Sequence, residues 1–150
     1  MACLLVVHHT PSPSMDAMLR AVLDGARAPE IEGVEVVSRA ALAATVPDVL
    51  AADGYLLGTP ANLGYMSGAL KHFFDTIYYP CLAETRGRPF GVYLHGDDDV
   101  DGAQRAIERI ATGLDWRLAQ PPLRVTGKPT AADLGGCWEL GAALAAGLVP

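Results

Sequence analysis

The sequence predicts an open α/β domain with a mostly parallel sheet and helices on both faces. Short apolar or β-branched runs alternate five times with segments whose apolar residues recur at helical spacing. The first run, Cys3 to Val7, is apolar at every position, as expected of a central strand buried on both faces. Because consecutive parallel strands need a crossover, usually a helix, the alternation favours a parallel sheet over hairpins.

Composition and charge limit the possible partners. The chain has 150 residues, 51% of them hydrophobic and 19% charged, which predicts one globular domain over 1–150. A net charge of −6 disfavours nucleic acid and an anionic membrane surface as partners. The 3 cysteines have no CxxC spacing, and the sequence shows neither a basic leader nor a long apolar span. These features predict a cytoplasmic protein.

The elements follow one another at regular intervals. The five predicted strands are short and apolar: 3–7, 34–37, 54–58, 89–94 and 123–125. Each is followed by a segment with helical spacing. The first begins near Met15, the second covers about 40–51, the third begins at the N-cap Ser67, the fourth spans 103–114 and the fifth covers about 140–148. Pro121 and Pro122 restrict the fifth strand to an edge or a strand start, since proline has no N–H to donate.

Three turns should line one edge of this sheet. In open α/β sheets, ligands bind outside the carboxyl ends of the strands. The turns that follow the first, third and fourth strands cover 10–15, 59–66 and 95–101. We therefore expect the binding site to be built from these three segments.

The first turn has two interpretations. Thr10, Ser12 and Ser14 place three hydroxyls at a helix start, where free backbone N–H groups and the helix dipole attract a phosphate. Against this, Pro13 lacks an N–H, and Asp16 puts a carboxylate in the first helical turn. In the other interpretation Ser14 caps the helix and Asp16 complements its dipole. The sequence leaves both open.

The second turn is long for a strand-to-helix connection. Its sequence is GTPANLGYMSGALKHFFD, from Gly58 to Asp75. Backbone amides between Ala61 and Gly64 are placed to hydrogen-bond the edge of a flat heterocycle, with Leu63 and Tyr65 packing against it. An ordinary loop is the alternative, although such loops usually need only a few residues. Within the following helix, Lys71 and Asp75 are four apart and predict a surface ion pair.

This second turn resembles flavodoxin-like proteins of the NAD(P)H-dependent FMN reductase and quinone reductase group. The shared pattern is G-[TS]-P-x-x-x-G-x-[MV]-S-G-x-[LM]-K-x-F-x-D, carried here by Gly58, Thr59, Pro60, Gly64, Met66, Ser67, Gly68, Leu70, Lys71, Phe73 and Asp75. The resemblance implies a three-layer sandwich, a five-stranded parallel sheet in the order 2-1-3-4-5, and FMN held by the three turns. It also implies a homodimer or homotetramer, NAD(P)H as electron donor, and a quinone, flavin or other small molecule as acceptor.

Site residues follow from the same resemblance. The phosphate of FMN would be held by Thr10, Ser12, Ser14 and Met15. The isoalloxazine ring would be flanked by Thr59, Pro60, Ala61, Asn62, Leu63, Gly64 and Tyr65, with His95 and Gly96 approaching its other side. His95 and Tyr65 are the candidate catalytic residues: a histidine side chain titrates near neutral pH and can supply a proton, and Tyr65 borders the exposed flavin face.

Two departures from the family pattern keep other functions open. Pro13, Ser14 and Met15 replace the usual residues of the first turn, and Asp97, Asp98 and Asp99 add three carboxylates to the third. One alternative is an electron-carrier flavodoxin that docks to protein partners. The other is a flavodoxin-like domain that binds flavin weakly or not at all.

The adjacent histidines and the arginines before the fourth strand are further candidates for binding a metal or a nucleotide. The side chains of His8 and His9 point to opposite faces of an extended strand, so a metal site is the minor interpretation and none is predicted. Arg86 and Arg88 flank Gly87 before the fourth strand, where a solvated turn is favoured over contact with a nucleotide phosphate.

Overall fold

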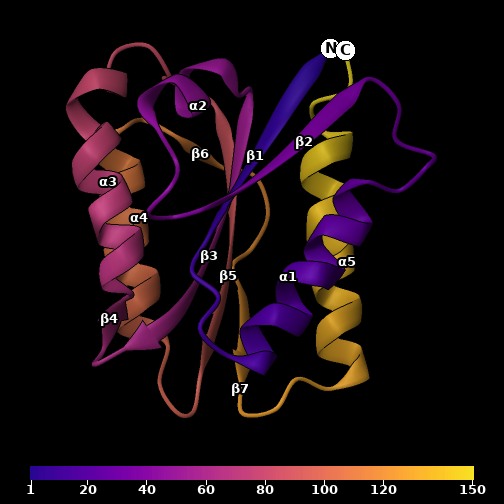
Figure 1. Cartoon of the computed structure of the whole chain (residues 1–150), viewed down its shortest axis with the longest axis vertical. Coiled ribbons are helices and arrows are strands. Elements are labelled where there is room, and N and C mark those ends of the chain that lie inside the picture. The colour runs from indigo at the N-terminus through magenta and orange to yellow at the C-terminus, as the bar shows by residue number, and fades with distance from the viewer.

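Strand β1 (Ala2–His8) lies inside a parallel sheet in the computed structural model, which describes all 150 residues. In spatial order the sheet contains β2 (Val34–Ala40), β1, β3 (Gly54–Asn62), β5 (Pro89–Gly96) and an edge formed by β6 (Arg117–Leu118) and β7 (Leu123–Thr126). Because β5 and β7 are the fourth and fifth predicted strands, the predicted order 2-1-3-4-5 is confirmed. Figure 1 shows this sheet between two layers of helices.

Two short strands go beyond the five that were predicted. β6 pairs with Pro89 and Phe90 at the start of β5, whereas β7 pairs further along the same edge, from Tyr93 to Gly96. The proline pair interrupts this edge, and β7 begins directly after Pro122, as predicted. The second addition is β4 (Tyr65–Met66), which runs antiparallel to the end of β3.

The helices divide between the two faces. α1 (Pro13–Ala26) and α5 (Ala131–Ala146) cover one face, on the right of Figure 1. α2 (Val46–Ala51), α3 (Gly68–Cys81) and α4 (Asp101–Gly113) cover the other. None of them is both long enough and apolar enough to cross a membrane.

The predicted helix over 40–51 was too long. β2 continues to Ala40, and α2 starts only after Thr45. The Thr45 hydroxyl accepts the Asp48 N–H at 3.2 Å, and the Asp48 carboxylate accepts the Thr45 N–H at 2.9 Å. This reciprocal capping box fixes the helix start, whereas the alanines before it favour a helix only by propensity.

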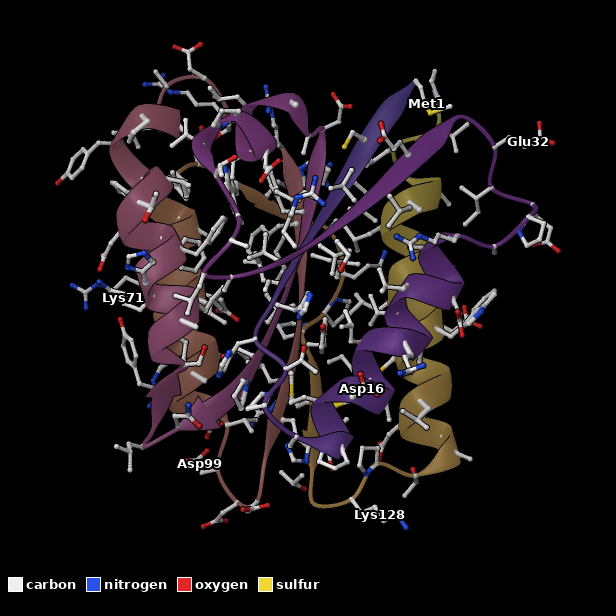
Figure 2. All side chains as sticks on the ribbon, in the orientation of Figure 1. Met1, Asp16, Glu32, Lys71, Asp99 and Lys128 are labelled. Atoms are coloured by element: carbon white, nitrogen blue, oxygen red, sulfur yellow. The ribbon has the colours of Figure 1, made fainter.

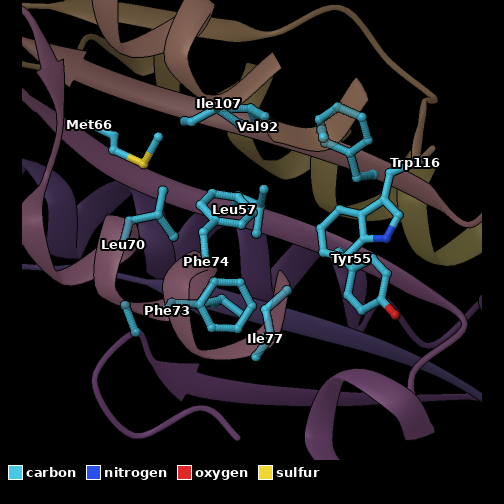
Figure 3. Packing of buried hydrophobic residues seen from close by; sticks show 14 of the residues in the cluster. Tyr55, Leu57, Met66, Leu70, Phe73, Phe74, Ile77, Val92, Ile107 and Trp116 are labelled. Atoms are coloured by element: carbon cyan, nitrogen blue, oxygen red, sulfur yellow. The ribbon is translucent and has the colours of Figure 1, made fainter. Parts of the chain in front are cut away.

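The larger core lies between the sheet and α2, α3 and α4 (Figure 3). In it Tyr55 stacks on Trp116, with 4.1 Å between ring centroids, and the Trp116 indole N–H donates to the Thr85 hydroxyl at 2.8 Å. The Tyr55 hydroxyl donates to the Val49 carbonyl at 2.7 Å, and burial raises the pKa of Tyr55 to about 12. Both polar groups of this aromatic pair therefore have partners inside the core.

The second core lies under α1 and α5. Leu4 and Val6 of β1 point into it, whereas Leu5 and Val7 point into the first core. β1 is thus buried on both faces, as its continuous apolar run predicted. Tyr93 of β5 is fully buried here, and its hydroxyl has no hydrogen-bond partner.

Arg88 is not part of a solvated turn, so that interpretation was wrong for this residue. Its guanidinium Nη1 caps the C-terminal end of α2 by donating to the carbonyls of Val49 (3.3 Å), Leu50 (3.0 Å) and Ala52 (2.6 Å) and to the Tyr55 hydroxyl (3.2 Å). Arg88 directly precedes β5, at the amino edge of the sheet. It is therefore remote from the three turns expected to bind a ligand. Arg86 is exposed and forms no ion pair within 4.0 Å.

Candidate functional site

Three loops meet at the carboxyl edge of the sheet, which is the lower edge in Figures 1 and 2; Figure 2 labels Asp99 and Lys128 there. In the pairing register His8, the last residue of β1, lies beside Gly58, and Gly58 lies beside Tyr93, so β3 and β5 run on past β1 at the same edge. The His9 N–H donates to the Gly58 carbonyl at 3.0 Å. The prediction that the turns after these strands open onto one edge is confirmed.

The second of these loops is a β-hairpin, whereas the sequence predicted an irregular turn over 59–66. β3 continues to Asn62, and Asn62 pairs with Tyr65 across a two-residue turn. Leu63 and Gly64 form that turn with φ of 51° and 76°. Positive φ at both central residues is the geometry of a type I′ turn, which suits the twist of a hairpin. Leu63 is fully exposed at its tip, and Tyr65 is 41% exposed.

Thr59 holds the base of the hairpin. Its side chain is fully buried, its hydroxyl accepts the Ser67 N–H at 3.0 Å, and it donates to the Pro60 carbonyl at 2.8 Å. Ser67 is the N-cap of α3, as predicted, since its hydroxyl accepts the Leu70 N–H at 3.1 Å. Thr59 thus links the end of β3 to the start of α3, and its hydroxyl is already used within the chain.

The hairpin tip rests on the start of α4. An added Cβ at Gly102 would overlap the carbonyl oxygen of Gly64, so the two backbones are in direct contact. Since α4 follows the third loop, this contact joins the second loop to the third. A residue larger than glycine at position 102 would push the two loops apart.

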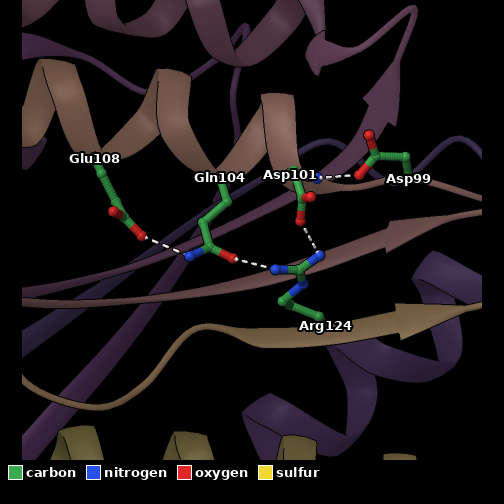
Figure 4. A network of polar contacts seen from close by, with 5 residues as sticks. All are labelled: Asp99, Asp101, Gln104, Glu108 and Arg124. Carbon is green, nitrogen blue, oxygen red and sulfur yellow. Dashed lines mark hydrogen bonds and ion pairs between the residues drawn. The ribbon is translucent and has the colours of Figure 1, made fainter.

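A polar network fixes the same end of α4 (Figure 4). Asp101 forms an ion pair with Arg124 of β7, and Arg124 also donates to the Gln104 side chain at 3.2 Å. The Asp99 carboxylate accepts the Asp101 N–H at 2.8 Å, which shows one aspartate of the third loop in a local turn. Arg124 lies 23 residues from Asp101 along the chain, so no local spacing predicts this pair.

Ser12, not Ser14, caps α1, so the predicted cap was placed two residues late. The Ser12 hydroxyl accepts the Met15 N–H at 3.2 Å, and Pro13 occupies the first helical position, where proline is favoured. Met15 itself is fully buried. The Ser14 N–H makes no hydrogen bond within the chain, which leaves it free at the start of the helix. Asp16 is paired with Arg20 at 2.7 Å.

His8 contacts the first loop directly. Its Nδ1 lies 2.7 Å from the Thr10 hydroxyl oxygen. Burial, with a smaller contribution from His9, lowers the pKa of His8 below its ordinary value. The neutral ring has two tautomers, and the one that carries its proton on Nδ1 donates to Thr10 and frees the threonine hydroxyl hydrogen for an anion.

His95 is held by the loop that follows β7. Its Nε2 lies 2.8 Å from the Gly127 carbonyl oxygen. A carbonyl only accepts, so Nε2 carries a proton, and the neutral ring presents Nδ1 as an acceptor. Only the charged ring would also have a proton on Nδ1. Gly96 is buried beside it, and the Gly127 N–H donates to the Gly96 carbonyl at 2.9 Å.

Comparisons with known proteins agree on the architecture. No family model matches the chain. A flavodoxin of Aquifex aeolicus (strain VF5) is 36% identical over 88 residues, which cover 59% of this chain and 46% of that protein, so the match spans about half of its length. A solved flavodoxin from the domain Archaea is 21% identical, with a TM-score of 0.80 over 97% of this chain and 98% of that one. The flavodoxin, WrbA-like protein of Agrobacterium tumefaciens is 20% identical, with a TM-score of 0.76 over 97% and 96%.

The chain has a flavodoxin-like fold. A third solved structure, two-electron reduced Megasphaera elsdenii flavodoxin, is 22% identical, with a TM-score of 0.78 over 95% of this chain and 98% of that one. The predicted fold is therefore confirmed along nearly the whole chain, including its three-layer arrangement.

The first loop of this flavodoxin-like chain offers groups that fit a phosphate. The free Ser14 N–H, the Ser14 hydroxyl and the Thr10 hydroxyl are donors, and they lie at the positive end of the α1 dipole. All three belong to residues that are not fully buried. The Ser12 hydroxyl and the Met15 N–H bond each other instead, so the anion site is smaller than the four predicted residues indicate.

The other predicted residues fall into two groups that differ in what they can offer a ligand. Met15, Thr59, Pro60 and Gly96 are buried, so any contribution they make comes from the backbone. Ala61, Asn62, Leu63, Gly64 and Tyr65 form the exposed or half-exposed hairpin. The structure holds no group of three or more His, Cys, Asp or Glu side chains placed to bind a metal ion.

Proposed function

We propose that the chain binds FMN at the carboxyl edge of its sheet and passes electrons from NAD(P)H to a quinone, a flavin or another small acceptor. The observation that supports the proposal is that the start of α1, with the hydroxyls of Thr10 and Ser14, and the exposed β3–β4 hairpin lie at the same edge of the sheet. In such folds this edge is the ligand site. When bound, FMN supplies the electron chemistry, and the chain supplies binding and orientation.

Each loop has its own part in binding. Ser14 and Thr10 hold the phosphate with neutral donors, and His8 orients the Thr10 hydroxyl. The hairpin from Ala61 to Tyr65 lies along the ring, and its exposed backbone amides face the polar edge of the heterocycle. Thr59 and Gly102 act as positioning residues, because they set the base and the tip of that hairpin.

His95 and Tyr65 border the proposed reaction face. A hydride carries two electrons and one proton, whereas reduction of a quinone to a hydroquinone consumes two protons, so one proton comes from the chain or from solvent. His95 supplies it in its charged form, since the neutral ring has its only proton on Nε2, directed at Gly127. His95→Gln should therefore change the pH dependence of acceptor reduction, and an unchanged profile would remove His95 from the mechanism.

The FMN proposal is tested by comparing FMN with riboflavin, which has the same ring and no phosphate. Fluorescence titration should show that the wild-type protein binds FMN about tenfold more tightly than riboflavin, because hydrogen bonds to a charged group are strong. Ser14→Asp places a carboxylate at the phosphate site and should abolish the difference while leaving riboflavin affinity unchanged. Equal affinities in the wild type would contradict the phosphate site.

A second candidate function is an electron carrier that docks to protein partners. The flavodoxin named among the relatives and the exposed Leu63 at the hairpin tip favour it. Steady-state oxidation of NAD(P)H by an FMN-loaded chain with a quinone acceptor would favour the enzyme. FMN binding without such turnover would favour the carrier. Assembly into a homodimer or homotetramer stays a prediction, which sedimentation velocity tests directly.

A further inference from the structure

A groove of about 760 Å³ lies between α3 and α4 and ends at the back of the hairpin. Its walls come from both helices and the hairpin, and they consist of Gly64, Tyr65, Lys71, Gly102, Arg105, Ala106, Glu108, Arg109 and Ile110. The volume is within the range of small-molecule sites, roughly 300–1,000 Å³. Gly64 and Tyr65 are the two lining residues that also belong to the predicted cofactor contacts, and the other seven do not.

The groove is positive although the chain is acidic. Three cationic side chains line it against the single carboxylate of Glu108, while the whole chain has a net charge of −6. Arg105 and Arg109 are exposed, four residues apart on α4, and neither forms an ion pair within 4.0 Å. Like charges at this spacing repel each other on a helix surface. An anion between the two arginines would relieve that repulsion.

Two of the three carboxylates near the groove already have cationic partners, which leaves one negative charge against two free guanidinium groups. Asp75 pairs with Lys71 at 2.6 Å, as the sequence predicted, whereas Glu108 accepts a hydrogen bond from the neutral Gln104 amide at 2.8 Å and keeps its negative charge. Asp101 pairs with Arg124. The two free guanidinium groups of Arg105 and Arg109 are therefore the strongest unmatched charges at this surface, and a guanidinium recognises phosphate in a bidentate manner.

Aromatic and apolar surface lies beside these charges. Tyr65 forms one wall, and Ala106 and Ile110 contribute apolar surface. A second hollow of about 200 Å³ adjoins the groove, because Lys71 and Ile110 line both. Its lining also includes Tyr78 and Tyr79. Cations beside exposed aromatic rings fit a ligand that has both phosphates and a flat base, which is the chemistry of a nucleotide.

We infer that this groove binds the adenosine phosphates of NADPH, with Arg105 and Arg109 paired to the 2′-phosphate. The inference rests on the proposed function for the identity of the ligand, since NAD(P)H is the nucleotide that reaction uses. Tyr65 lines this groove and also belongs to the hairpin that is proposed to flank the flavin, so a dinucleotide bound across the hairpin would reach both. The extra phosphate makes NADPH the preferred donor over NADH.

The first experiment uses the protein as isolated, with adenosine 2′,5′-bisphosphate as the probe and 5′-AMP as its matched analogue without the 2′-phosphate. Calorimetric titration should show the bisphosphate binding about tenfold more tightly. The double variant Arg105→Gln/Arg109→Gln should abolish this preference. The control Arg86→Gln/Arg117→Gln changes net charge equally at two exposed arginines without ion pairs and should retain it.

The second experiment measures NAD(P)H oxidation by the FMN-loaded protein. Arg105→Gln/Arg109→Gln should raise the KM for NADPH about tenfold, leave kcat unchanged and leave NADH kinetics unchanged. The first titration needs no FMN, so it tests the groove even where the proposed function fails. Absence of bisphosphate binding, an equal loss in both double variants, or tighter binding of poly-glutamate than of the bisphosphate would overturn the inference. The last result would assign the groove to an acidic protein partner.

Discussion

The backbone of Gly102 lies directly against the carbonyl oxygen of Gly64. This contact places the first turn of α4 under the tip of the β3–β4 hairpin, and it connects two of the three loops at the carboxyl edge. Glycine suits position 64 because the turn requires a positive φ there. Glycine is required at position 102 because the Gly64 carbonyl oxygen occupies the space of a side chain. The two glycines therefore serve one arrangement for different reasons.

Gly102→Ala should displace the hairpin and destabilise the protein. The added methyl group overlaps the Gly64 carbonyl, and overpacking of this kind costs about 1–3 kcal/mol. We expect a lower midpoint of thermal unfolding and about tenfold weaker FMN binding. Gly135→Ala is the matched control, because Gly135 lies in α5 with no atom within 4 Å of an added Cβ. It should be neutral or stabilising by up to about 1 kcal/mol. Equal effects of both variants would refute the contact.

Arg88→Ala should lower stability without changing ligand binding. The substitution leaves the carbonyls at the end of α2 and the Tyr55 hydroxyl without their charged donor. Loss of such bonds lowers the free energy of unfolding by about 2 kcal/mol, which urea titration measures. Arg86→Ala, two residues away and exposed, should have no effect. Reduced FMN affinity in Arg88→Ala would show that the amino edge influences the site.

Tyr93→Phe and Tyr55→Phe should have different effects on the free energy of unfolding, although each variant removes one buried hydroxyl. Tyr93 has no hydrogen-bond partner, so its hydroxyl is a desolvated group with no compensation, and removing it should leave stability unchanged or higher. Tyr55 donates to Val49, and Tyr55→Phe should cost about 1 kcal/mol. Chemical denaturation of the two variants provides the comparison. A destabilised Tyr93→Phe would indicate that a water or another group satisfies that hydroxyl.

Local patterns predicted the fold well because each depends on neighbouring residues. The continuous apolar run of β1, the cap at Ser67 and the prolines before β7 act within a few positions, and all three were confirmed. The shared motif from Gly58 to Asp75 led to the flavodoxin-like fold, which the structural comparisons confirm.

The errors concern interactions that sequence spacing does not encode. The hairpin was missed because its turn uses Leu63 at positive φ, where asparagine or glycine is the usual signal. Arg88 was interpreted as solvated because the partners of its Nη1 lie 33 to 39 residues away, at the end of α2 and on β3. The cap of α1 was placed at Ser14 since Ser12 and Ser14 both precede the apolar stripe, and only the backbone geometry distinguishes them.

Acidification should destabilise the protein through His8. Burial lowers the pKa of His8 in the folded state below the ordinary value of 6.5. Between the two pKa values the unfolded chain binds more protons than the folded one, so stability rises with pH there. The contribution is complete above about pH 6.5 and is lost as the pH falls through the folded pKa.

The wild type should therefore lose more stability between pH 7 and pH 5 than His8→Gln, measured by urea denaturation at each pH. Since Nδ1 of His8 lies 2.7 Å from the Thr10 hydroxyl, Thr10→Val should leave this pH dependence in place, because burial and not that bond is its main cause. Identical pH profiles for the wild type and His8→Gln would assign the acid sensitivity to other groups.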